Sequence, residues 1–95
     1  FTAAERLRIM LVDDDETVRD AVGGVLKRKG WSVEDFASAD EALGVLRNRA
    51  SRFNMVLADI NMPGLSGLEF LDLAREAAPN LPVVMITGYP SIDPA

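Results

Sequence analysis

The sequence has no cysteine and no histidine among its 95 residues. Without cysteine the chain has no disulfide, no thiolate nucleophile and no sulfur ligand for a structural zinc ion. Without histidine it has no Ser-His catalytic triad, no imidazole base and no phosphohistidine of its own. Any chemistry must therefore depend on carboxylates, hydroxyls, a lysine or a bound metal ion.

Long apolar runs and an excess of positive charge are also missing. The longest apolar runs are about five or six residues, far short of the roughly 20 that span a bilayer. Fifteen acidic residues against ten basic ones give a net charge of −5, which argues against a general nucleic-acid surface. The segment 1–8 lacks the apolar region of a signal peptide. We therefore expect a globular, cytoplasmic protein with no membrane partner and no direct nucleic-acid partner.

Strand-like and helix-like segments alternate along the chain. Apolar runs rich in β-branched residues predict strands at 7–13, 31–36, 54–59 and 82–87. Apolar residues at helical spacing predict a helix over 16–29, and Ser38 and Ser66 begin two further helices, each as a capping box with an acid three residues on. Strands that are apolar on both faces are typical of a parallel sheet covered on both sides. We predict an α/β fold, a doubly wound parallel sheet, in a single domain over residues 1–95 with an N-terminal tail at 1–6.

Polar side chains follow three of the predicted strands. The first strand ends in Asp13, Asp14 and Asp15, the third in Asp59 and the fourth in Thr87. Ligands bind at this edge of a parallel α/β sheet. Clustered carboxylates repel one another, so they either raise a carboxyl pKa or hold a cation, for which Mg²⁺ is suited to oxygen ligands. Each of these residues could also have an ordinary structural role. Asp15, for example, could serve only as the N-cap of the following helix.

Three motifs carry a resemblance to a known family. They are LVDDD at 11–15, LADINMPG at 57–64 with Gly67 beyond it, and MITG at 85–88. In that order they resemble the receiver domains of two-component response regulators, over about residues 7–93. The resemblance implies the flavodoxin-like receiver fold with strand order 2-1-3-4.

The resemblance also implies a role for each site residue. Asp59 is expected to accept a phosphoryl group from a histidine kinase or phosphotransfer protein, and Thr87 to hydrogen-bond a phosphoryl oxygen. Asp14, Asp59 and the main-chain carbonyl of Asn61 are expected to bind Mg²⁺ directly, with Asp13 acting through the water shell of the ion. Such a domain is not an enzyme in its own right; it switches an output, such as transcription regulation.

Receiver domains also have a fifth strand with a lysine at its end and further helices, which the sequence to Ala95 does not include. Lys27 and Lys29 are the only lysines, and both fall at the far end of the first predicted helix. We expect residues 82–87 to form an edge strand, through which the chain can self-associate.

Three other functions are compatible with this fold. A haloacid-dehalogenase-like phosphatase also forms an aspartyl phosphate, but it needs a second Asp two residues after the nucleophile, where this chain has Asn61. A degenerate receiver, acting only as a protein-interaction module, would lose part of the acidic cluster. A flavin-binding domain would need a phosphate loop after the first strand, where the acidic run 13–16 would repel phosphate.

Overall fold

The computed structural model describes residues 7–62 and 65–86. Strands and helices alternate as predicted, in the order β1 (Arg8–Val12), α1 (Glu16–Arg28), β2 (Ser32–Phe36), α2 (Ala39–Arg49), the 3₁₀-helix η2 (Ala50–Arg52), β3 (Met55–Asp59), α3 (Gly67–Ala77) and β4 (Val83–Ile86). All the strand pairs are parallel, and the sheet order β2-β1-β3-β4 confirms the predicted 2-1-3-4. None of the described helices is long and apolar enough to cross a membrane.

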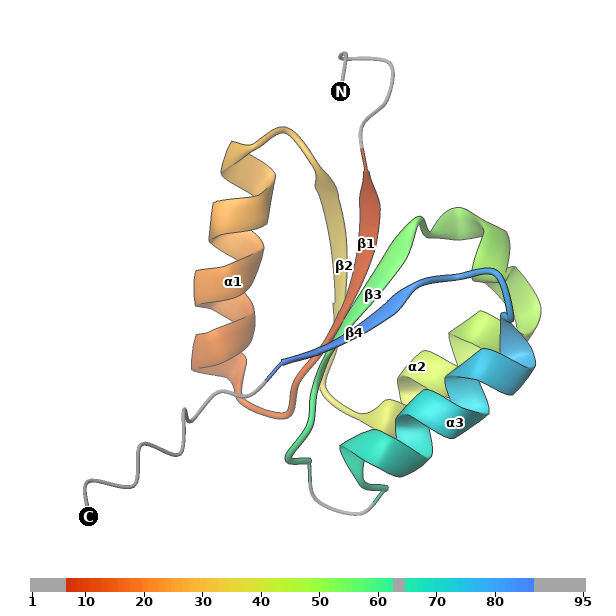
Figure 1. The fold of residues 1–95 in the computed structure, drawn as a ribbon. Coiled ribbons are helices and arrows are strands. Elements are labelled where there is room, and N and C mark those ends of the chain that lie inside the picture. The colour runs from red at the N-terminus through yellow and green to blue at the C-terminus, as the bar shows by residue number, and fades with distance from the viewer. Residues whose placement is uncertain (1–6, 63–64, 87–95) are drawn as a thin grey trace.

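The helices form two layers around the sheet, with α1 on one face and α2 and α3 on the other (Figure 1). The main core lies between the strands β1 and β3 and the helices α2 and α3. Met10, Leu46 and Phe70 are almost fully buried there. On the opposite face Leu11 lies next to Gly23, the one buried residue of α1. Burial of β1 on both faces explains its uninterrupted apolar run.

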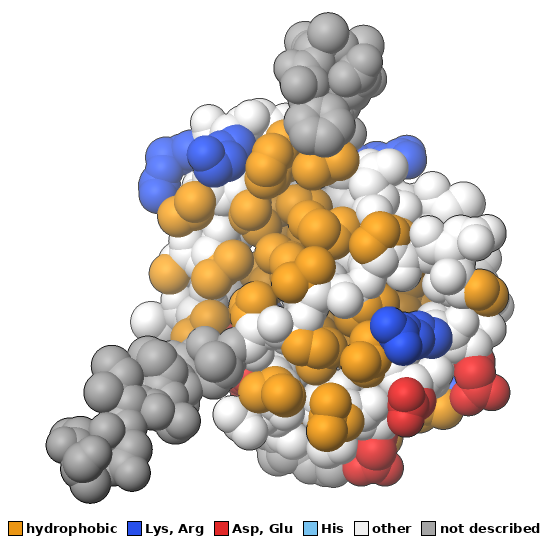
Figure 2. All heavy atoms as spheres, viewed as in Figure 1, with side chains coloured by type: hydrophobic (Ala, Val, Ile, Leu, Met, Phe, Trp, Pro, Cys, Tyr) orange, Lys and Arg blue, Asp and Glu red, His pale blue; other side chains and the backbone are white. Residues whose placement is uncertain are grey.

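The predicted apolar face of α1 is only partly buried. Val25 keeps 45% of its surface exposed, because no second described helix lies beside α1 on its face of the sheet. Figure 2 shows hydrophobic side chains gathered over the part of the surface that includes β4, between α1 and α3. The sequence pattern therefore located the helix correctly, although part of its apolar face stays exposed among the described residues.

Two of the helix starts agree with the predicted serine caps. The Ser66 hydroxyl accepts the N–H of Glu69, whose carboxylate in turn accepts the N–H of Ser66, which completes a capping box at α3. At α2 the hydroxyl of Ser38 accepts the N–H of Glu41 (3.2 Å). The returning bond from Glu41 is not formed among the described residues, so the capping box predicted there is wrong in its second half.

Candidate functional site

The two acidic strand ends meet because β1 and β3 are adjacent and in register. Val12 pairs with Ala58, so the next residue of each strand, Asp13 and Asp59, reaches the same edge of the sheet. Carboxylate oxygens of Asp13, Asp14 and Asp59 all lie within 4.8 Å of one another. Asp13 and Asp59 are 1% and 7% exposed, whereas Asp14 is exposed. The cluster therefore has two buried carboxylates and one that faces solvent.

Asp13 forms two hydrogen bonds with main-chain groups of neighbouring segments. Its N–H donates to the carbonyl of Phe36 (3.1 Å), and its Oδ1 accepts the N–H of Asp15 (2.9 Å). Burial raises the pKa of Asp13, the Asp15 N–H opposes that change, and the charges of Asp59, Asp14 and Asp15 add to it. Among the described residues its other oxygen, Oδ2, is buried without a hydrogen-bond partner.

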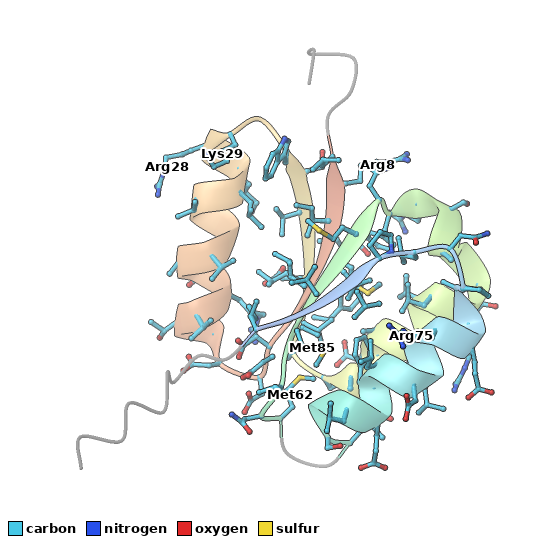
Figure 3. All side chains as sticks on the ribbon, viewed as in Figure 1. Arg8, Arg28, Lys29, Met62, Arg75 and Met85 are labelled. Carbon is cyan, nitrogen blue, oxygen red and sulfur yellow. The ribbon has the colours of Figure 1, made fainter. Side chains whose placement is uncertain are left out.

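Asp59 begins a loop that folds back onto the end of the sheet. Its Oδ1 accepts the N–H of Asn61 (3.0 Å), and the N–H of Ile60 donates to the carbonyl of Ile86 on β4 (2.8 Å). Met62 then inserts into the core, where Met85 packs against the same cluster (Figure 3). The loop that follows Asp59 is therefore held to the Asp59 carboxylate, to β4 and to the core.

The structure separates Asp15 from the other two members of the DDD run. Its carboxylate accepts the N–H groups of Thr17 (2.9 Å) and Val18 (3.4 Å), as the N-cap of α1. It does not belong to the carboxylate cluster. The alternative left open by the sequence is resolved: Asp15 caps a helix, while Asp13 and Asp14 converge on Asp59. The predicted role of Thr87 falls outside the described residues.

Arg19 also contacts the site, although the sequence pattern does not single it out. Its Nη1 donates to the main-chain carbonyl of Asp13 (2.7 Å), and its Nε donates to the carboxylate of Asp35 at the end of β2 (3.1 Å). An arginine in the second turn of an amphipathic helix has the pattern of an ordinary surface residue. Only its position four residues after the helix cap, facing the preceding loop, was available as a signal.

A divalent cation fits these residues. The three clustered carboxylates supply hard oxygen ligands, and the unpartnered Oδ2 of Asp13 is a buried acceptor that a cation or its water shell would satisfy. None of the three forms a salt bridge with a described residue. Lys29, with Arg28, lies at the end of α1 that is opposite the carboxyl ends of the strands (Figure 3), which agrees with the expectation that it does not serve the cluster.

Comparisons with known protein families and with individual proteins agree on one family. The family described as "Response regulator receiver domain" matches residues 9–95. The response regulator protein FleR of Pseudomonas aeruginosa is 39% identical over 88 residues, which cover 93% of this chain and 18% of FleR. The C4-dicarboxylate transport transcriptional regulatory protein DctD of Rhizobium meliloti is 38% identical over 84 residues, covering 88% of this chain and 18% of DctD. The chain thus spans less than a fifth of these relatives.

A solved structure extends the likeness to three dimensions. The CheY-like response regulator receiver domain protein from Methanospirillum hungatei JF-1 superposes with a TM-score of 0.81 at 36% sequence identity. The match covers 93% of this chain and 69% of that protein. The strand order found here is therefore embedded in a fold that is shared over nearly the whole chain.

Proposed function

Because this chain belongs to the response regulator receiver domain family, we propose that Asp59 is its phosphoacceptor. Receiver domains of this family act in two-component systems, and the alternative functions considered from the sequence are not favoured by the comparisons. The observation that carries the proposal is the meeting of Asp13, Asp14 and Asp59 within 4.8 Å at one sheet edge.

The proposed reaction transfers a phosphoryl group from phosphohistidine to Asp59. Oδ1 of Asp59 accepts the N–H of Asn61, which orients the carboxylate, and one oxygen of that carboxylate attacks phosphorus. The new O–P bond forms as the P–N bond to imidazole breaks, and the electron pair of that bond stays on the imidazole nitrogen. Thr87, which follows β4, is proposed to hydrogen-bond a phosphoryl oxygen of the product.

Mg²⁺ is the proposed cofactor. When bound it neutralises charge on the phosphoryl oxygens during transfer. We assign Asp14, Asp59 and the main-chain carbonyl of Asn61 to its direct ligands and Asp13 to its water shell. The chain fixes the orientation of the two buried carboxylates, those of Asp13 and Asp59. In each of them one oxygen accepts a main-chain N–H and the other oxygen is available to the site.

Treatment with acetyl phosphate and Mg²⁺, followed by intact-mass measurement, tests the proposal. Wild type should gain one phosphoryl group that hydroxylamine removes, as it removes acyl phosphates. Asp59→Asn should gain none, and Asp72→Asn, an exposed aspartate on α3, should behave as wild type. A phosphoryl group retained in the Asp59→Asn variant would contradict the assignment. Release of phosphate from added phosphomonoesters would instead favour the phosphatase alternative.

The partner that fits this chemistry is a histidine kinase or phosphotransfer protein in the cytoplasm. Residues 1–95 contain no histidine, so a phosphohistidine donor lies outside them, or the donor is a small acyl phosphate. DctD is a transcriptional regulatory protein, and we propose that the output switched here is also transcription regulation. With a net charge of −5, this chain is not the part that contacts nucleic acid. Its own role is to accept and lose phosphate, without turnover of a separate substrate.

We also propose that the chain self-associates through β4. Within the described sheet β4 is an outer strand, and its Val84 is 43% exposed. A hydrophobic outer strand offers main-chain groups to a second copy. Sedimentation of the chain should show a dimer that Val84→Lys weakens. A wild-type monomer at high concentration would remove this part of the proposal and leave the phosphoacceptor role untouched.

A further inference from the structure

Arg19 joins three segments that meet behind the carboxylate cluster. Only 14% of its side chain is exposed, and its two hydrogen bonds run in different directions from one planar group. The first bond runs from Nη1 to the carbonyl of Asp13, in the loop between β1 and α1. The second runs from Nε to the carboxylate of Asp35, near the end of β2. The rigid fork of arginine allows both bonds at once, whereas the single ammonium of lysine does not match that geometry.

The loop to which Arg19 is hydrogen-bonded, between β1 and α1, contains Asp13 and Asp14, two of the three clustered acids. Asp13 is fixed to β2 through its N–H, to the following turn through Oδ1 and to Arg19 through its carbonyl. The exposed Asp14 is the next residue, so its distance from Asp59 depends on the same short stretch of backbone. Partners behind a metal site orient its ligands, and losing one commonly lowers metal affinity roughly 10- to 100-fold.

We propose that Arg19 is a positioning residue for the magnesium site, acting through the main chain of Asp13 with Asp35 as its anchor. The inference rests on the proposed function, since it presupposes that the carboxylate cluster binds Mg²⁺. It adds a residue outside the cluster whose geometry determines how well the cluster binds the ion.

Charge and geometry make opposite predictions for Arg19, which makes the inference testable. Arg19→Met removes a positive charge near three carboxylates, so electrostatics alone would tighten Mg²⁺ binding. Loss of positioning would weaken it. A residue that only stabilises the fold would lower the free energy of unfolding and leave the affinity of the folded protein unchanged. The direction of the change in affinity therefore separates the three roles.

The measurement is a Mg²⁺ titration of the chain, followed by amide chemical shifts, alongside urea unfolding of each variant. Arg19→Met should weaken Mg²⁺ binding roughly tenfold. Arg19→Lys keeps the charge and should also weaken it, so it tests the positioning role independently if Arg19→Met does not fold. Arg52→Met is the matched control, because Arg52 forms a bridge of equal length, 3.1 Å, to Glu34 on the same strand β2. Its affinity should equal that of wild type.

The outcomes distinguish this inference from the function on which it rests. If folded Arg19→Met and Arg19→Lys bind Mg²⁺ as tightly as wild type or more tightly, the positioning role is overturned while the metal site stands. If Arg52→Met weakens binding as much as Arg19→Met does, the effect is not local and the role is also overturned. If wild type does not respond to Mg²⁺, the metal site itself fails and the inference with it.

Discussion

Gly67, the first residue of α3, lies directly against the main chain of Ile60, the residue after Asp59. A Cβ at Gly67 would lie 2.5 Å from the Cα of Ile60 and 2.6 Å from its carbonyl oxygen. The N–H of Gly67 donates to that same carbonyl (3.2 Å). The start of α3 is therefore in contact with the residue that follows the proposed phosphoacceptor, Asp59, at a distance that only glycine allows.

Gly67→Ala should destabilise the fold, because the obstructing atoms are backbone and cannot rotate away. We expect the free energy of unfolding in urea to fall by about 1–3 kcal/mol, the usual cost of overpacking. Gly44→Ala is the matched control within α2, since a Cβ there meets nothing within 4 Å. It should stabilise the protein by up to about 1 kcal/mol, as alanine does in a helix. Equal effects of the two substitutions would refute the steric explanation.

Asp13→Asn should stabilise the metal-free protein at neutral pH. Burial and neighbouring charges raise the pKa of Asp13 in the folded state above its ordinary value of 3.8. The stability linked to its protonated form is complete below pH 3.8 and is lost as pH rises through the folded-state pKa. The advantage of asparagine should therefore be greatest near neutrality and shrink as the pH falls. Urea unfolding at a series of pH values, with a chelator present, measures it. An advantage independent of pH would show that the charge of Asp13 is not the cause.

Asp14→Ala should nearly abolish Mg²⁺ binding while leaving the fold intact, because this carboxylate is exposed and belongs to the cluster. Amide shifts during a Mg²⁺ titration are the suitable probe, since Trp31 precedes β2 and so lies at the other end of the sheet. Asp72→Asn provides the control for simple loss of an exposed negative charge. Unaltered affinity in the Asp14 variant would remove this residue from the site.

Asp15→Ala should have the opposite profile. Loss of the N-cap should lower the free energy of unfolding by about 1 kcal/mol, with a far smaller loss of Mg²⁺ affinity than in Asp14→Ala. Ser66→Ala removes the corresponding cap of α3 and should cost a similar amount of stability. If Asp15→Ala instead loses Mg²⁺ binding as Asp14→Ala does, Asp15 is a ligand and the cap is secondary.

The sequence predicted the order and type of the strands and α-helices, because 54–59 is a compact apolar run and the apolar residues of 16–29 recur at helical spacing. It also predicted that the acids after β1 and β3 meet, since the carboxyl ends of parallel strands share one edge, but it left the role of Asp15 open. It did not predict η2, which has no buried residue and therefore no apolar pattern. Nor did it predict the bonds of Arg19, which depend on where the end of β2 lies relative to α1. Contacts of that kind follow from tertiary packing and leave no periodic mark.

The pairing of β1 with β3 has a further consequence, for the kinetics of folding. Arg8 and Asn54, which are bonded across this pair, are 46 positions apart in the chain, so a long loop must close before the strands meet. The carboxylate cluster is built across the same pair and does not exist until the pair has formed. Mg²⁺ should therefore slow unfolding, and it should accelerate folding only to the extent that β1 and β3 are already joined in the transition state. The ratio of the change in folding rate to the change in unfolding rate would show whether β1 and β3 pair before or after the transition state of folding.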